Sequence, residues 1–134
     1  MDILNQIYEL LKDDPFMREH VEGRYAFNET PDAQDIETSY VTINPVIYGV
    51  PTAYADGKRI ADANSARVDV FINANGIKDT NPRILCMELM ERVADILDDN
   101  FYDQTSSFAP SYDNDLKLYR ESRGFQTNYY RSDY

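Results

Sequence analysis

The spacing of apolar residues near the start of the chain predicts an amphipathic helix over about residues 3–12. These apolar positions fall on one stripe, at Ile3, Leu4, Ile7, Leu10 and Leu11. Asp2 precedes the stripe and predicts an N-cap, because its carboxylate can accept hydrogen bonds from the first free amides. Pro15 disfavours helical geometry in the residue before it, so the first helix should end there and a short second turn should run to Val21.

Alternating patterns predict three strands in the middle of the chain. Residues 24–28 alternate aromatic with other side chains and predict a short strand. Residues 39–45 carry apolar side chains on one face, which is typical of a strand covered on one side, and Pro45 indicates its end or an edge position. The clearest strand pattern covers residues 66–73. Its apolar face carries Val68, Val70 and Ile72.

Residues 48–64 show little periodicity and contain Gly49, Pro51 and several alanines. This composition predicts a long, partly mobile loop, with Asp56-Gly57 as a tight turn at its tip. A loop of this length is uncommon in so small a domain unless it has a function. Because the segment lacks the regular apolar spacing of a core element, we expect deletion of residues 49–63 to leave the fold intact. We also expect this deletion to block assembly.

The second half of the chain predicts one long helix and two late strands. Asn81 followed by Pro82 is a good helix start, and the apolar stripe continues to residue 97. Its members are Leu85, Leu89, Val93 and Ile96. A turn at residues 113–115 separates two segments rich in aromatic and hydroxyl side chains, which could pair as a hairpin with a bend or bulge at Gly124.

These elements predict one α+β domain over residues 1–134, since a chain of this length can bury a single core. We expect a mixed or mainly antiparallel sheet, packed by the amino-terminal helix and a longer central helix. The long mobile loop at about residues 48–64 and a flexible carboxy-terminal tail at about residues 131–134 complete this prediction.

The formal net charge of −11 restricts the kinds of molecule that this protein can bind. It would repel phosphate backbones, so we expect no nucleic acid as a partner. The longest apolar-rich segment, residues 84–97, is interrupted by charged side chains, so we expect no membrane helix. The charge either keeps the protein soluble and monomeric before assembly or matches a basic partner. The first residues lack a basic region and a cleavage-like site, and we expect a cytoplasmic origin.

Residues suited to chemistry are few and isolated. His20 is the single histidine, Cys86 is the single cysteine, and neither a Gly-x-Ser-x-Gly motif nor a glycine-rich phosphate loop occurs. The pattern around Cys86 predicts a buried, inert thiol. Residues 113–115 lack the glycine and distal glutamate of a calcium loop. We therefore predict no enzyme, no catalytic residue, no metal and no cofactor.

The aromatic composition favours a binding surface. The chain has eleven tyrosines and no tryptophan, and tyrosine supplies large contact area at low entropic cost. Strand-face packing and a frayed tail are the alternative explanation for the late tyrosines. On physical grounds the candidate interface residues are Tyr48, Val50, Tyr54, Arg59, Ile60, Arg67, Tyr129, Tyr130 and Arg131.

The order of elements resembles one known family over nearly the whole chain. The resemblance rests on the helix at residues 3–11, Arg24-Tyr25-Ala26-Phe27, Tyr40-Val41-Thr42-Ile43, the loop at residues 51–64, Arg67-Val68-Asp69-Val70-Phe71, the helix at residues 82–97 and a closing strand at Phe125. In this pattern the chain resembles the tail completion proteins of long-tailed bacteriophages, also called tail terminator or tail-to-head joining proteins, in particular that of a Bacillus siphophage.

The resemblance implies a structural virion protein, monomeric when free and hexameric on the tail. Such a protein caps the tail tube and docks on the head connector, so its partners would be the tail tube protein and the connector or stopper protein. It would be assembled in the host cytoplasm and reside at the head–tail interface of the virion. A head-side stopper is the nearest alternative and should be a more β-rich barrel. A small acidic inhibitor that mimics DNA and a small hydrolase are alternatives from other classes.

Overall fold

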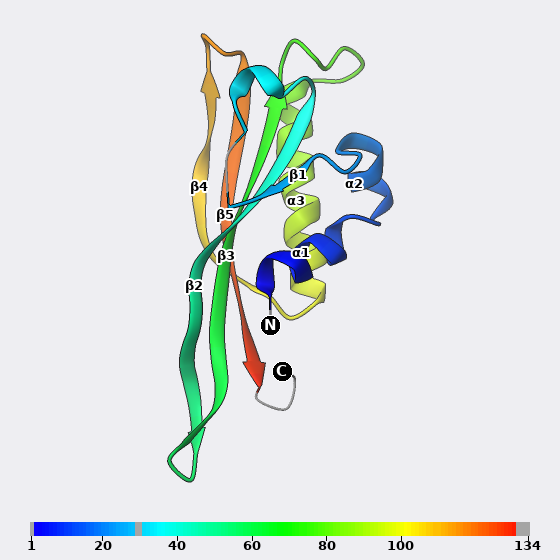
Figure 1. The fold of residues 1–134 in the computed structure, drawn as a ribbon. Coiled ribbons are helices and arrows are strands. Elements are labelled where there is room, and N and C mark those ends of the chain that lie inside the picture. Colours follow the sequence, from blue (N-terminus) through cyan, green and yellow to red (C-terminus); the bar gives the residue numbers. More distant parts are fainter. Residues whose placement is uncertain (1, 29–30, 131–134) are drawn as a thin grey trace.

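The computed structural model describes residues 2–28 and 31–130, and its centre is a five-stranded sheet in the spatial order β1-β2-β3-β5-β4 (Figure 1). The strands are β1 (Tyr25–Phe27), β2 (Ser39–Ala55), β3 (Lys58–Asn73), β4 (Asp103–Asp113) and β5 (Leu118–Tyr130). β1 runs parallel to β2, and every other neighbouring pair is antiparallel. The prediction of an α+β fold with a mainly antiparallel sheet is confirmed.

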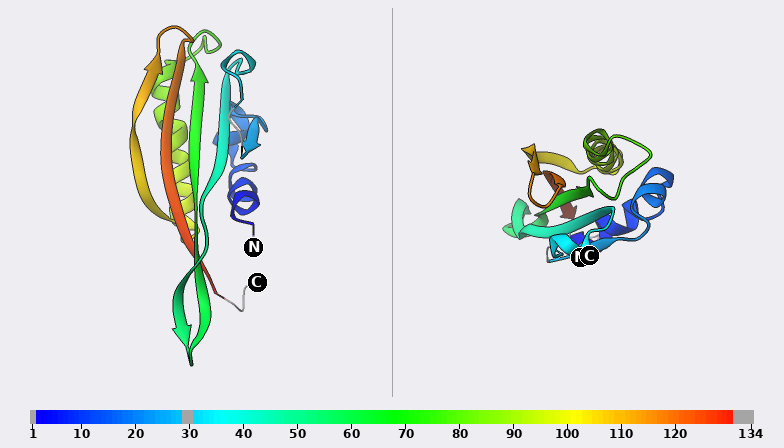
Figure 2. Two further views of the ribbon diagram at one scale, coloured as in Figure 1. Left: turned by 60° about the vertical axis from the view of Figure 1, so that its left-hand side comes forward. Right: turned by 90° about the horizontal axis from the view of Figure 1, so that it is seen from above.

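Three α-helices cover one face of this sheet (Figures 1 and 2). They are α1 (Ile3–Leu11), α2 (Pro15–His20) and α3 (Pro82–Asp99), and a 3₁₀ turn, η1 (Ala33–Asp35), lies between β1 and β2. The predicted caps form as expected. Asp2 accepts hydrogen bonds from the amides of Leu4 and Asn5, and Asn81 caps α3 in the same way. No helix in the described ranges is both long and apolar enough to cross a bilayer.

The core lies between the helices and the covered face of the sheet. β3 contributes four buried side chains to it, namely Ala66, Val68, Val70 and Ile72. The stripe of α3 packs on them through Leu85, Leu89, Val93 and Ile96, as the spacing predicted. Tyr102 and Tyr129 also enter the core, and both hydroxyls hydrogen-bond to the side chain of Gln6 on α1. The core therefore ties the first and the last elements of the chain together.

The predicted mobile loop at residues 48–64 is wrong, because this segment forms the paired outer halves of β2 and β3. The weak periodicity has a physical cause: β2 shifts register at several points between Pro45 and Tyr54, and each irregularity interrupts the two-residue alternation. Ala61 and Ala63 are buried and pair with β5. Deletion of residues 49–63 would therefore remove part of the central strand, so the expectation that it spares the fold is not supported.

Asp14 makes two separate interactions, one that caps α2 and one that joins α2 to α3. One carboxylate oxygen accepts a hydrogen bond from the amide of Met17 at 3.2 Å, which caps α2. The other oxygen accepts from Arg92 of α3, whose Nε lies 3.0 Å away. The Arg92 guanidinium holds the pKa of Asp14 below its ordinary value of 3.8. The stabilisation should accordingly be complete above that ordinary value and decline as the pH falls through the lower folded-state pKa.

Two substitutions of Asp14 should separate these roles. Asp14→Ala removes the cap and the ion pair and should lower the free energy of unfolding by about 1–2 kcal/mol. Asp14→Asn keeps a capping oxygen and should cost less, since it removes only the charge. Urea unfolding should show both losses at neutral pH and smaller ones near about pH 3. Equal losses for the two variants would show that the cap contributes nothing.

Candidate functional site

An arm formed by residues 46–60 extends from the sheet beyond the region that the helices cover (Figures 1 and 2), and it is two-stranded beyond Ala61, where the pairing of β3 with β5 ends. Pairing between β2 and β3 continues along it to Ala55 and Lys58. Asp56 and Gly57 form the two-residue turn at its tip, with φ of 53° and 73°. Positive φ at both positions is the geometry of a type I′ hairpin turn, so the predicted tight turn is confirmed.

The arm exposes apolar side chains along most of its length. These side chains are Val46, Ile47, Tyr48, Val50, Tyr54 and Ile60, with exposed fractions between 37% and 64%. Its first strand also lacks charge, because none of the 17 residues of β2 is acidic or basic. In a protein with 28% charged residues, an uncharged and apolar projecting strand indicates a contact surface.

The outer edge of β2 is open along the arm. β1 pairs with β2 only from Val41 to Ile43, so no strand among residues 2–28 and 31–130 covers that edge beyond this point. Proteins commonly protect such edges with charged side chains, bulges or prolines. β2 has bulges and two prolines, Pro45 and Pro51, but no charge. The amides of Ile47 and Gly49 donate to the side chains of Ser65 and Asn64, and the other outward-facing backbone groups of this edge have no strand partner within the described residues.

The opposite margin of the sheet is formed by β4 and is open as well. β4 pairs with β5 only, and all eleven of its residues are exposed. Between its terminal residues Asp103 and Asp113 it carries no charge, and it presents Phe108 and Tyr112 to solvent. β4 is irregular opposite Gly124, where a β-carbon would lie 2.4 Å from the Ser106 hydroxyl. The predicted bulge at Gly124 therefore lies in the partner strand.

The face of the sheet that the helices leave uncovered carries an ionic cluster. Asp69 is fully buried, and its Oδ2 accepts hydrogen bonds from Arg67 Nε at 3.2 Å and from Arg120 Nη2 at 3.3 Å. The guanidinium of Arg120 also lies 5.2 Å from the centre of the Phe71 ring. Beside this cluster is a hollow of about 200 Å³ between Val46 of β2 and Phe108 of β4. The two open edges therefore border one shared face.

Removing the cations of this cluster should destabilise the fold unevenly. Arg67→Ala or Arg120→Ala alone leaves one guanidinium on Asp69, whereas the double variant leaves a buried carboxylate with no cation. The double variant should lose about 3–5 kcal/mol of unfolding free energy, more than the two single losses added together. Urea unfolding of all three variants measures this difference. A loss in the double variant equal to the sum of the two single losses would contradict this prediction, because the two arginines would then act independently on Asp69.

The structure gathers most of the predicted interface residues on the arm and separates the others. Tyr48, Val50, Tyr54, Arg59 and Ile60 belong to the arm. Arg67 lies in the ionic cluster, and Tyr130 is exposed at the end of β5, opposite Ala61. Tyr129 is buried in the core, so for this tyrosine strand-face packing is the correct explanation. Arg131 and the predicted tail at residues 131–134 lie outside the described residues.

The sequence predicts a late hairpin, which β4 and β5 form, but it does not mark β4, Val46 or Ile47 as a contact surface. A usable signal was present, since residues 104–112 form a stretch of nine uncharged residues with aromatic side chains. Its meaning depends on β4 lying at the margin of the sheet, which is a property of strand order and not of the local pattern.

The isolated reactive side chains have ordinary structural surroundings. Cys86 is buried in α3, as predicted, and burial raises the pKa of its thiol to about 12. His20 packs edge-on against Phe16, with ring centres 4.6 Å apart. Over the described part of the chain, no three histidine, cysteine, aspartate or glutamate residues are grouped as metal ligands would be.

Comparisons with known proteins leave the family of this chain open. No protein-family profile matches the sequence, and no curated protein matches it. Several solved structures match, and one of them aligns with 96% of this chain and 99% of its own, at 14% identity and a TM-score of 0.42. A similarity at that level carries no argument about function.

Proposed function

We propose that this chain is a structural assembly subunit that caps the end of a phage tail tube and forms the surface that joins the tail to the head connector. One observation carries the proposal: the sheet has an open edge on each side, that of β2 along the arm, where β2 has no charged residue, and that of β4, which is uncharged between Asp103 and Asp113. Such edges favour strand addition from another copy of the chain.

Two different edges on one protomer favour head-to-tail association. If β4 of one copy pairs with the arm of the next, the sheet continues from subunit to subunit. Contacts between two unlike surfaces of identical subunits form a closed ring when the rotation between copies closes. The hexamer number itself comes from the resemblance to tail completion proteins and not from the geometry.

The net charge of −11 supports a subunit that is monomeric until it meets its tail. Repulsion between copies opposes association in free solution, and it weakens as salt screens the charges. The end of a tail tube would overcome this repulsion by holding several copies at once. The exposed side chains of the arm, Tyr48 and Tyr54 among them, would then contact the tube protein or the connector.

The proposal assigns no catalytic residue and no cofactor, and it places the protein at the head–tail interface of the virion. A head-side stopper, the nearest alternative, should be a more β-rich barrel. An open sheet backed by the 18-residue helix α3 supports the tail-side assignment.

Charges placed on the two open edges should prevent assembly without unfolding the protein. Val50→Lys and Phe108→Lys are both at exposed positions, and each should block incorporation because a lysine on an edge opposes strand pairing. Leu116→Lys is the matched control, since Leu116 is exposed in the turn between β4 and β5.

The assay is light scattering after chromatography, on the protein alone and after mixing with purified tails that lack their terminal protein. Wild type and the control should be monomeric alone, join tails in multiples and restore head attachment. Incorporation of both edge variants at the wild-type level would exclude edge pairing. A wild-type protein that ignores tails but binds isolated connectors would favour the stopper alternative.

A shortened arm should separate folding from assembly more safely than deletion of residues 49–63. Replacing residues 53–60 with Asn-Gly keeps Ala61 and Ala63 in the central strand and closes the hairpin with a favoured turn. The variant also carries Asp62→Asn, because the replacement removes Arg59, the cation paired with this buried carboxylate. Circular dichroism should show one cooperative melting transition, while tail incorporation should be lost. Loss of cooperative unfolding would show that the arm is part of the core fold.

A further inference from the structure

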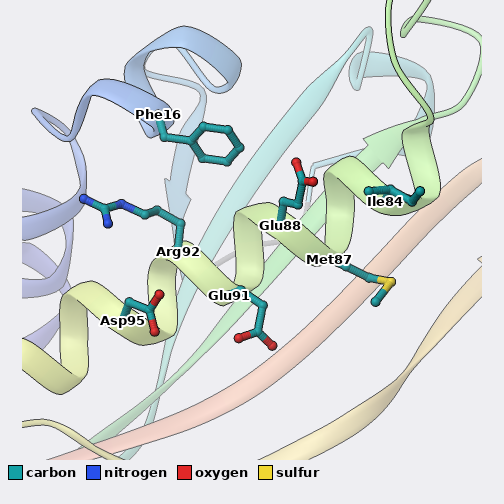
Figure 3. Close-up of a pocket in the computed structure, with 7 residues that line it drawn as sticks. All are labelled: Phe16, Ile84, Met87, Glu88, Glu91, Arg92 and Asp95. Carbon is teal, nitrogen blue, oxygen red and sulfur yellow. The ribbon is translucent and has the colours of Figure 1, made fainter.

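A second surface lies on the helical side of the molecule, between α2 and the exposed face of α3 (Figure 3). It is a shallow groove of about 530 Å³ whose apolar lining comes from Phe16 on one side of α3, Met87 on the other side, and Ile84 (Figure 3). Ile84 and Met87 are 41% and 43% exposed, so neither serves the core of the sheet. The core stripe of α3 is complete without them, which leaves these apolar side chains without a function inside the described fold.

The rim of this groove is acidic. Three carboxylates line it, from Glu88, Glu91 and Asp95, together with a single cation, Arg92 (Figure 3). Arg92 is already engaged by Asp14 in an ion pair. Glu91 is paired with Arg123 of β5, whereas Glu88 and Asp95 make no hydrogen bond or ion pair within residues 2–28 and 31–130. The groove thus combines apolar side chains with two carboxylates that form no ion pair, of which Asp95 lies within electrostatic reach of Arg92.

The groove is held in place by the packing of α2 on α3. The ion pair between Asp14 and Arg92 joins the start of α2 to the middle of α3, and Phe16 follows two residues after Asp14. His20 packs edge-on against the Phe16 ring and restricts its orientation. The Phe16 side of the groove is therefore fixed before any partner binds, which lowers the entropic cost of binding there.

We propose that this groove binds a basic amphipathic segment of another protein. Its apolar side chains would lie on Phe16, Ile84 and Met87, and its lysine or arginine side chains would reach Glu88 and Asp95. Charge complementarity selects this occupant, because a second copy of the chain carries a net charge of −11 and would be repelled by an acidic rim. The inference does not rest on the proposed tail function, since it concerns a different face of the molecule.

The test uses three synthetic helical peptides. The first carries a leucine stripe flanked by lysines, the second has the leucines replaced by serine, and the third has the lysines replaced by glutamate. Binding to the full chain is measured by calorimetry, and the site is located from the NMR signals of the Ile84 and Met87 methyl groups. Only the first peptide should bind and shift both methyl groups, because the site needs apolar contact and charge together.

Charge reversal distinguishes this groove from general attraction to an acidic protein. The variant with Glu88→Lys and Asp95→Lys should bind the lysine peptide about tenfold or more weakly and gain binding to the glutamate peptide. A variant with Glu37→Lys and Asp115→Lys has the same total charge and should bind as wild type does, since both positions lie away from the groove.

Equal weakening in both double variants would overturn the proposal, because it would mean that only net charge matters. Binding of the serine peptide as tightly as the leucine peptide, or methyl shifts absent from Ile84 and Met87, would overturn it as well. Light scattering with no peptide present tests self-association. A dimer that Met87→Glu dissolves would assign the groove to a second copy and reject the basic partner.

Discussion

β3 pairs along both of its edges, and the rest of the structure depends on that double pairing. β2 lies along one edge from Lys58 to Ile72, and β5 lies along the other from Ala61 to Asn73. The inner part of the strand bears the apolar face on which α1 and α3 pack, while its first three residues belong to the arm. Because one continuous strand supplies both, the arm is a continuation of the core sheet and not a separate loop.

The distribution of charge follows from the same architecture. Acidic residues concentrate in helices and turns, whereas β2 has no charged residue and β4 has charges only at its ends. Repulsion between whole molecules and attraction between open edges therefore act through different parts of the surface. In the proposed function this separation keeps free copies apart, while the two edges stay available for pairing once a tail holds copies together.

Local sequence patterns predicted the helices and the hairpin turn, but they did not predict strand register or which face of a strand is buried. The helices at residues 3–12 and 82–97 followed from apolar spacing and caps, and the turn at Asp56-Gly57 followed from its dipeptide. The arm did not, because register shifts and small alanines hide the alternation of a paired strand. Tyr129 and Tyr130 lie next to each other on opposite faces, so composition alone could not assign one to the core and the other to the surface.

The helical groove and the ionic cluster on the uncovered face depend on residues distant in sequence. Asp14 meets Arg92 because α2 packs on α3, and Arg120 meets Asp69 because β5 pairs with β3. Residue spacing predicts contacts within one helix or strand, and not contacts between residues this far apart in the sequence. The open margin of β4 is of the same kind, since it follows from the strand order and not from the residues of β4 themselves.

Hydrogen exchange measured by mass spectrometry, on the free protein and on protein incorporated into tails, shows whether the two open edges pair with neighbouring copies. Outward-facing amides of residues 46–55 and 104–112 should exchange rapidly in the free protein and become protected together in the assembly, because both edges then carry strand hydrogen bonds. Unchanged exchange in both segments after incorporation would contradict this pairing.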